Sequence, residues 1–329
     1  MRPLMFAKTS LVTFNIPGWH WALLIGWFLF LLAIDVLVLH RDDKERSLRH
    51  AALETTAWIG LGVALGVLFW HLYGAAAGQQ YFSGYLIEKS LSIDNVFAWS
   101  VILSYFTVPP KYQYRVLFWG IFGALIMRAI FIFGGVAIIQ KFEPVVLLLA
   151  AVLLFTGVKL LASKESHEFN PGESKLFLWF KSRVPVSHQF DGHNFFTVEN
   201  GRRVATVLLL ALVLVEFTDV IFAIDSVPAI LAISRDPFIV FASNAAAILG
   251  LRSLYFVFTK IKDRFWLLNK ALGILMVGIA IKMGLGPHEL FGRPWVGLEI
   301  STVAGLSFIA VIILGSTFLS IVIKDPKKS

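Results

Sequence analysis

Long apolar blocks restrict this chain to very few folds. Residues 204–224 and 302–323 are two of them, and each exceeds the roughly 18 residues that mark a candidate bilayer span. Hydrophobic residues make up 57% of the chain and charged residues only 15%, where a soluble domain carries about 25% charged residues. The sequence therefore predicts an all-α, polytopic membrane helix bundle in which residues 1–329 form a single transmembrane domain embedded in the lipid bilayer.

About nine transmembrane helices can be placed along the chain. The longest connection between them covers residues 163–203, where Ser174–Val184 mixes aromatic and basic residues, as in a short helix lying on a membrane surface. The predicted spans cover approximately residues 19–39, 51–73, 84–106, 116–135, 144–162, 204–227, 238–258, 266–285 and 296–322.

Lysine and arginine are distributed unevenly over the loops that join these spans. One alternate set of loops, which includes residues 163–203, holds 18 of these residues, and the other set holds five. Cytoplasmic loops carry the excess of Lys and Arg. We therefore expect the N-terminus outside, the C-terminus in the cytoplasm and residues 163–203 in a cytoplasmic loop. The net charge of +8 is explained by this bias, so no nucleic-acid partner is expected.

The chain contains an internal repeat. Residues 88–98 align with 219–229: in both, an acidic residue is followed six positions later by Ile-Asp, a small polar residue, Val and then Ala. Repeat A covers about residues 84–162 and repeat B about 204–285. Because their first spans would enter the membrane from opposite sides, the two units of three helices form an inverted repeat. Secondary transporters use this construction, with a binding site near the midplane.

Ionisable residues lie inside the predicted spans, where each costs roughly 2.5 to 3.5 kcal/mol on insertion scales. Five carboxylates against three bases leave two negative charges, if Asp35 is set aside because it lies near a cytoplasmic end. That excess requires two protons or one divalent cation. The acids are Glu88, Asp94, Glu216, Asp219 and Asp225, and the bases, expected to act as counter-charges or gating residues, are Lys89, Arg128 and Arg252.

Helical spacing adds two polar residues to the candidate site. Asn95 follows Glu88 by seven residues and Ser226 follows Asp219 by seven, so each pair shares a helix face. Pro228 predicts an interruption of the sixth span, and the repeat extends that expectation to Asp94-Asn95. All the candidate ligands are oxygen donors, which suit Mg²⁺, Ca²⁺ or Mn²⁺ and do not suit Zn²⁺ or Cu⁺.

Other functions are less compatible with the residues. The chain has no cysteine, which excludes disulfides, thiolate metal sites and iron–sulfur clusters, and we expect no tightly bound cofactor. The spans contain no nucleophile and base pair, so an enzyme is not expected. One alternative stays open, in which the intramembrane charges only hold helices together in a scaffold or assembly factor. The sequence also leaves open whether the protein forms a homodimer.

Several strings resemble the TerC family of membrane proteins, in particular its pH-responsive bacterial branch. They include residues 84–91, 94–97, 215–230, 236–240 and 247–256. The resemblance implies a multi-pass protein of the bacterial inner membrane that exports manganese, with Mn²⁺ as the transported ion. It also implies that the family's intramembrane acids correspond to Glu88, Asp94, Glu216, Asp219 and Asp225. The residues by themselves indicate only a hard divalent cation, moved by a rocking of the two repeats, and they leave open whether it is exchanged for protons.

Overall fold

A computed structural model describes residues 16–37, 47–142, 144–162, 179, 182–187, 190–199, 201–261, 267–286, 288–290, 293–295, 297 and 300–323. Helices dominate this part of the chain. They are α1 (Gly18–Leu37), α2 (Leu48–Tyr73), α3 (Ala75–Tyr105), α4 (Pro110–Lys141), α5 (Val145–Ala162), α7 (Val207–Leu231), α8 (Pro237–Ile248), α9 (Leu251–Ile261), α10 (Leu268–Leu285) and α11 (Thr302–Val322).

The helices confirm a polytopic bundle. In the described part of the chain, six helices are long and apolar enough to cross a membrane, or seven if the bent pair of α8 and α9 forms one span. Helix α3 is not among them, and it carries Glu88, Lys89 and Asp94. Every predicted span coincides with a helix or with this bent pair. The number nine and the inverted repeat remain predictions.

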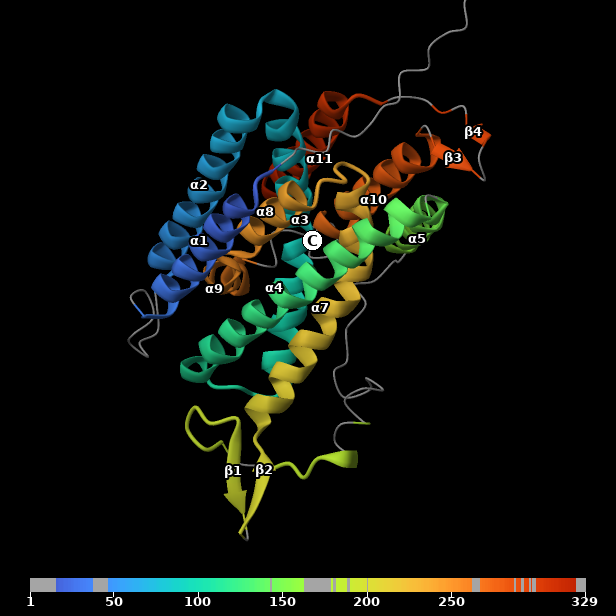
Figure 1. The fold of residues 1–329 in the computed structure, drawn as a ribbon. Coiled ribbons are helices and arrows are strands. Elements are labelled where there is room, and N and C mark those ends of the chain that lie inside the picture. Colours follow the sequence, from blue (N-terminus) through green and yellow to red (C-terminus); the bar gives the residue numbers. More distant parts are fainter. Residues whose placement is uncertain are drawn as a thin grey trace, which may run out of the picture.

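Helix α3 occupies the interior of the bundle (Figure 1). It packs against α2, α7, α8, α9 and α11, and most of its residues are buried. Helices α1, α2, α5 and α11 instead expose large apolar side chains, such as Leu23, Phe155 and Leu314. Exposed apolar faces of this kind suit lipid. Burial against protein on all sides explains why α3 tolerates charges that a lipid-facing helix would avoid.

Corresponding helices of the two predicted repeats pack against each other: α3 on α7, α4 on α8 and α5 on α10. The contact between α5 and α10 depends on glycine. A Cβ atom added at Gly157 would lie 3.0 Å from the carbonyl oxygen of Gly273, and one added at Gly273 would lie 3.1 Å from the carbonyl oxygen of Gly157. Small residues permit such close backbone approach in membrane helices. This pairing agrees with a pseudo-two-fold relation, while the opposite orientation of the repeats stays a prediction.

Helix ends that the predicted topology assigns to one side of the membrane meet in the structure. The Tyr255 hydroxyl donates to Gln113 Oε1 over 3.1 Å, which joins α9 to the beginning of α4. At the other end of the bundle Phe69 of α2 stacks on Phe238 of α8, with 5.4 Å between ring centroids. These contacts fit the alternation of the predicted spans. Which end faces the cytoplasm stays a prediction.

The expected helix interruptions are wrong. Helix α7 continues through Pro228 to Leu231, and α3 runs without a break through Asp94 and Asn95. Pro228 lies close to the end of α7, where its missing amide removes a single helical hydrogen bond. The break occurs instead within the predicted span 238–258, where α8 and α9 are bent by 44°. Gly250 adopts a φ of 77° there, a conformation that favours glycine.

Part of the loop 163–203 folds as a hairpin that extends from the end of the bundle where α7 begins (Figure 1). Strand β1 (Phe196–Glu199) pairs antiparallel with β2 (Arg202–Ala205), so the helix begins at Val207 instead of residue 204. Arg115 at the start of α4 lies over the Phe195 ring, 5.2 Å from its centroid. Most of the predicted surface helix 174–184 lies outside the described residues. A second small hairpin joins β3 (His288–Leu290) to β4 (Arg293–Trp295).

Candidate functional site

A cluster of buried polar side chains lies where four helices meet. We call it the central cluster. Helix α3 contributes Glu88, Ser92 and Asn95, α4 contributes Arg128, α7 contributes Asp219 and Ser226, and α8 contributes Asn244. Each of these side chains is at most 1% exposed. Two of these helices belong to predicted repeat A and two to predicted repeat B.

Arg128 connects the two carboxylates of the central cluster. Its guanidinium pairs with Glu88 Oε1, reaches Asp219 Oδ1 at 3.2 Å and lies 3.5 Å from Asp219 Oδ2. It also donates to Ser226 Oγ over 3.5 Å. A planar guanidinium suits this role because its donors spread in fixed directions. The predicted faces are thereby confirmed, since residues from both heptad-spaced pairs converge on one arginine.

Two asparagines complete the coordination of the carboxylates. Asn95 Nδ2 donates to Asp219 Oδ1 over 3.1 Å, and Asn244 Nδ2 donates to Glu88 Oε2 over 2.9 Å. An ionised carboxylate only accepts hydrogen bonds, so each amide must present its NH₂ group to it. The oxygen atoms of both amides are buried and have no hydrogen-bond donor among the described residues. An acceptor left in this state costs about 1 to 3 kcal/mol.

The central cluster divides the core into two hydrophobic clusters. On α4, Ile121 belongs to one cluster and Ile132 to the other, with Arg128 between them. On α7, Asp219 likewise marks the boundary between the two hydrophobic clusters. Charges at such a depth are stable only when they are paired and hydrogen-bonded. The charged groups of the central cluster meet that condition. Its two amide oxygens have no hydrogen-bond donor among the described residues.

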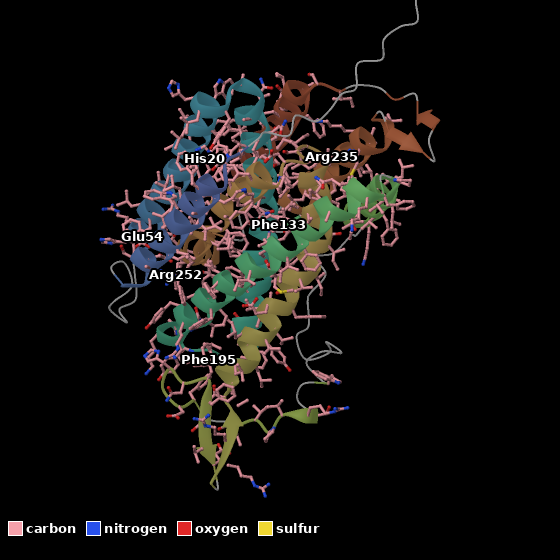
Figure 2. The ribbon with its side chains drawn as sticks, in the orientation of Figure 1. His20, Glu54, Phe133, Phe195, Arg235 and Arg252 are labelled. Carbon is pink, nitrogen blue, oxygen red and sulfur yellow. The ribbon has the colours of Figure 1, made fainter. Side chains whose placement is uncertain are left out.

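Arg252, predicted as a counter-charge of this site, belongs to a separate ion pair. Its guanidinium lies 2.5 Å from Asp35 Oδ1 and donates to the backbone carbonyl of Asp35 over 2.9 Å. The pair fixes α9 to α1, on the side of the bundle where Figure 2 labels Arg252. The sequence interpretation set Asp35 aside because it lies near a helix end, and Asp35 does lie in the last turn of α1. In the structure Asp35 is 7% exposed.

Lys89 forms no ion pair with the two carboxylates of the central cluster among the described residues. Its ammonium group donates to the carbonyl oxygens of Ala247 at 3.1 Å and Leu249 at 3.4 Å. These carbonyls lie at the break between α8 and α9, where the helical hydrogen-bond pattern stops. Lys89 therefore caps the end of α8.

Three further predicted acids make no hydrogen bond or ion pair with the central cluster in the described part of the chain. Thr156 of α5 donates to Asp225 Oδ1 over 3.1 Å, and the Glu216 carboxylate packs against Gly123 of α4, where a Cβ atom would overlap it. Asp94 is partly buried and has no hydrogen-bond or ion-pair partner in the described part of the chain. The expectation of one site formed by all five acids therefore holds only for Glu88 and Asp219.

The charge balance changes with these positions. Asp35 neutralises Arg252, which leaves five carboxylates against Lys89 and Arg128. Within the central cluster, two carboxylates face one guanidinium. The described residues contain no group of three or more His, Cys, Asp or Glu side chains that could hold a metal. A cation at this position would therefore need amide or hydroxyl oxygens beside the two carboxylates.

Asn244 is the site residue that the sequence interpretation missed. It is the one amide side chain in the apolar run Pro237–Ile248. A polar side chain in such a run is unfavourable in lipid unless it finds a partner, and this was the available signal. The repeat did not reveal it, because its two halves align on their charged residues.

A cavity of about 230 Å³ lies between α3, α10 and α11. Apolar side chains line most of it, together with Ser83 and Lys282. None of the residues of the central cluster contributes to its wall. The cavity is therefore separate from the paired carboxylates.

The bundle and the central cluster define a polytopic membrane protein with paired charges in its interior. Comparison with known families gives the specific assignment: residues 73–328 match the "Integral membrane protein TerC family". The chain belongs to the TerC family.

Its bacterial relatives cover most of its length. An uncharacterized membrane protein, STKORF319, from Myxococcus xanthus is 41% identical over 309 residues, which cover 94% of this chain and 93% of that protein. Alx from Escherichia coli strain K12 is 40% identical over 262 residues, which cover 77% of this chain and 81% of that protein. The name of the Alx relatives describes them as membrane-bound redox modulators. The similarity to Alx confirms the branch that the sequence motifs indicated. No solved structure matches the chain significantly.

Proposed function

We propose that the protein is a secondary transporter that exports a divalent metal cation, with Mn²⁺ as the physiological ion. The central cluster provides the binding site between repeats A and B. The observation that carries the proposal is the combination of two buried carboxylates with two amide oxygens for which the described residues supply no donor. A hard cation is the ligand that such a set of oxygen atoms accepts.

The position of the central cluster supports transport. It lies in the interior of the bundle, on helices from both predicted repeats, where binding sites of secondary transporters occur. Mn²⁺ is preferred over Mg²⁺ or Ca²⁺ because of the TerC family resemblance, since the ligands alone select only a hard divalent ion. We place the protein in the bacterial inner membrane with its N-terminus outside and its C-terminus in the cytoplasm.

The name given to the Alx relatives suggests a redox role. This chain has no cysteine, so its own side chains provide no thiol–disulfide chemistry. Metal transport remains the function that the buried oxygen ligands support best.

A scaffold or assembly factor is the second candidate. The pair of Asp35 with Arg252 favours it, because this ion pair joins two helices and lies away from the central cluster. If Glu88 and Asp219 only joined helices through Arg128, removing a carboxylate would disturb folding or the recovery of partner proteins and leave cellular metal unchanged.

The test is manganese efflux from cells that carry Glu88→Gln or Asp219→Asn as the only copy. Each variant leaves Arg128 paired with the other carboxylate, so the protein should still reach the membrane in normal amount. We expect both to lose efflux and to raise cellular manganese. Glu199→Gln, an exposed carboxylate on β1, serves as the matched control and should export normally. Normal manganese tolerance in both variants would remove the proposal.

A further inference from the structure

The Arg128 guanidinium occupies the carboxylate oxygens that a cation would need. It engages Glu88 Oε1 and both oxygens of Asp219. Divalent ions bind carboxylate oxygens at about 2.0 to 2.6 Å. A metal ion at that distance from the same atoms would lie close to the positively charged guanidinium. Little water is present in the interior to screen the repulsion between the two cations. The two cations therefore exclude each other.

Charge counting gives the same result. With Arg128 present, the two carboxylates of the central cluster carry an excess of one negative charge. With Arg128 withdrawn, the excess is two, which one divalent cation neutralises. A site that held neither cation would keep two uncompensated buried charges, which is the least favourable case, so either the arginine or the metal must be present.

The amide oxygens of Asn95 and Asn244 indicate what the site accepts in place of the guanidinium. Both side chains are 1% exposed, and each is held by a hydrogen bond from its NH₂ group to a carboxylate of the cluster. Both oxygens lack a donor among the described residues. Arg128 does not satisfy them, whereas a hard cation binds amide oxygens readily.

We propose that Arg128 is a tethered competitor of the transported ion. The metal displaces the guanidinium from Glu88 and Asp219 and gains Asn95 Oδ1 and Asn244 Oδ1 as further ligands, and the return of Arg128 expels the metal. This inference rests on the proposed function and adds to it a residue that drives release and a ligand, Asn244, from repeat B.

The experiment measures Mn²⁺ binding to the purified full-length protein in detergent micelles. Arg128→Gln removes the competitor, so Mn²⁺ should bind roughly 10- to 100-fold more tightly than to the wild type, and Mn²⁺ should raise its unfolding temperature more. Arg252→Gln is the matched control, because it removes an equally buried arginine outside the central cluster. Its Mn²⁺ affinity should equal that of the wild type.

Asn244→Leu introduced into the Arg128→Gln protein should reverse the gain in affinity by about tenfold. If Arg128→Gln is not recovered from the membrane, Arg128→Lys takes its place. A lysine ammonium contacts fewer carboxylate oxygens than a guanidinium, so Mn²⁺ should again bind more tightly, by a smaller factor. Binding that is unchanged or weaker in the Arg128 variants overturns the inference.

The same assays separate this inference from the proposed function. A wild-type protein that exports Mn²⁺, combined with Arg128 variants that bind it no more tightly, rejects the competitor and leaves the transporter intact. A wild-type protein that neither binds nor exports Mn²⁺ rejects both. Tighter binding by Arg128→Gln together with slower efflux from cells is the result we expect, because the ion then remains on its site.

Discussion

Replacing Asp35 with asparagine tests whether the ion pair between α1 and α9 is structural. The side chains of Asp35 and Arg252 are 9% and 2% exposed, and their charged atoms lie 2.5 Å apart. Asp35→Asn removes the negative charge that faces the buried guanidinium. The backbone carbonyl of residue 35 still accepts from Arg252 at 2.9 Å.

Removing one partner of a buried pair costs about 3 to 5 kcal/mol, whereas replacing both partners can be nearly neutral. We therefore expect Asp35→Asn and Arg252→Gln each to lower the free energy of unfolding by about 3 kcal/mol. The double variant should lose about as much as one single variant, which gives a coupling energy of about 3 kcal/mol. The assay is a denaturant titration in micelles followed by tryptophan fluorescence. Glu199→Gln on the exposed hairpin should stay within about 0.5 kcal/mol of the wild type.

Strictly additive effects in the double variant would refute this reasoning, because they would mean that the two side chains do not interact. A loss below about 1 kcal/mol in both single variants would also refute it. That result would show that water reaches the pair and screens it, as at a surface.

Two further substitutions test the break between α8 and α9. Gly250→Ala should destabilise the protein by more than about 2 kcal/mol, because the residue has a φ of 77° and an added Cβ atom would lie 2.5 Å from the Cβ of Trp58. Gly60→Ala is the control, because an added Cβ atom there would meet nothing within 4 Å. It should be neutral or slightly stabilising when the two variants are compared by thermal unfolding. Lys89→Met should cost about 1 to 3 kcal/mol, because two carbonyls at the break lose their donor, while Lys270→Met on the exposed face of α10 should have little effect in the same assay. A Gly250→Ala protein as stable as Gly60→Ala, or a Lys89→Met protein as stable as Lys270→Met, would contradict the role given to the break.

Local periodicity predicted part of the central cluster correctly. Residues seven apart share a helix face whatever the surroundings, and this placed Glu88 with Asn95 and Asp219 with Ser226. The charge of Arg128 in an apolar span required a carboxylate partner. These inferences succeeded because the first depends only on the geometry of a single helix. The second depends on the free-energy penalty of burying any unpaired charge.

Partner choice between distant helices could not be predicted in the same way. Asp35 and Arg252 are 217 residues apart, and nothing in their local sequence connects them. Residues 249–256 around Arg252 resemble residues 125–131 around Arg128, yet the two arginines contact different acids, because similarity between halves does not fix which neighbour each helix meets. Long-range packing therefore decided these pairs.

The position of the helix break shows a second limit. Pro228 lacks an amide hydrogen, but near the end of α7 that loss affects one bond and the helix continues. Gly250 permits a positive φ, which a sequence alone cannot distinguish from an ordinary helical glycine. Asn200-Gly201 predicts a tight hairpin turn by its residue types, so the strands on either side of it could have been foreseen.

The bonds made by Arg128 have a consequence for biosynthesis. Glu88 and Arg128 lie on consecutive helices, so the pair can neutralise itself as soon as both helices have left the ribosome. Asp219 follows Arg128 by 91 residues, and its helix must enter a bilayer where the guanidinium already has one partner. A hairpin of α3 and α4 can thus form first, and the guanidinium donors that Glu88 does not use can bind Asp219 when α7 inserts.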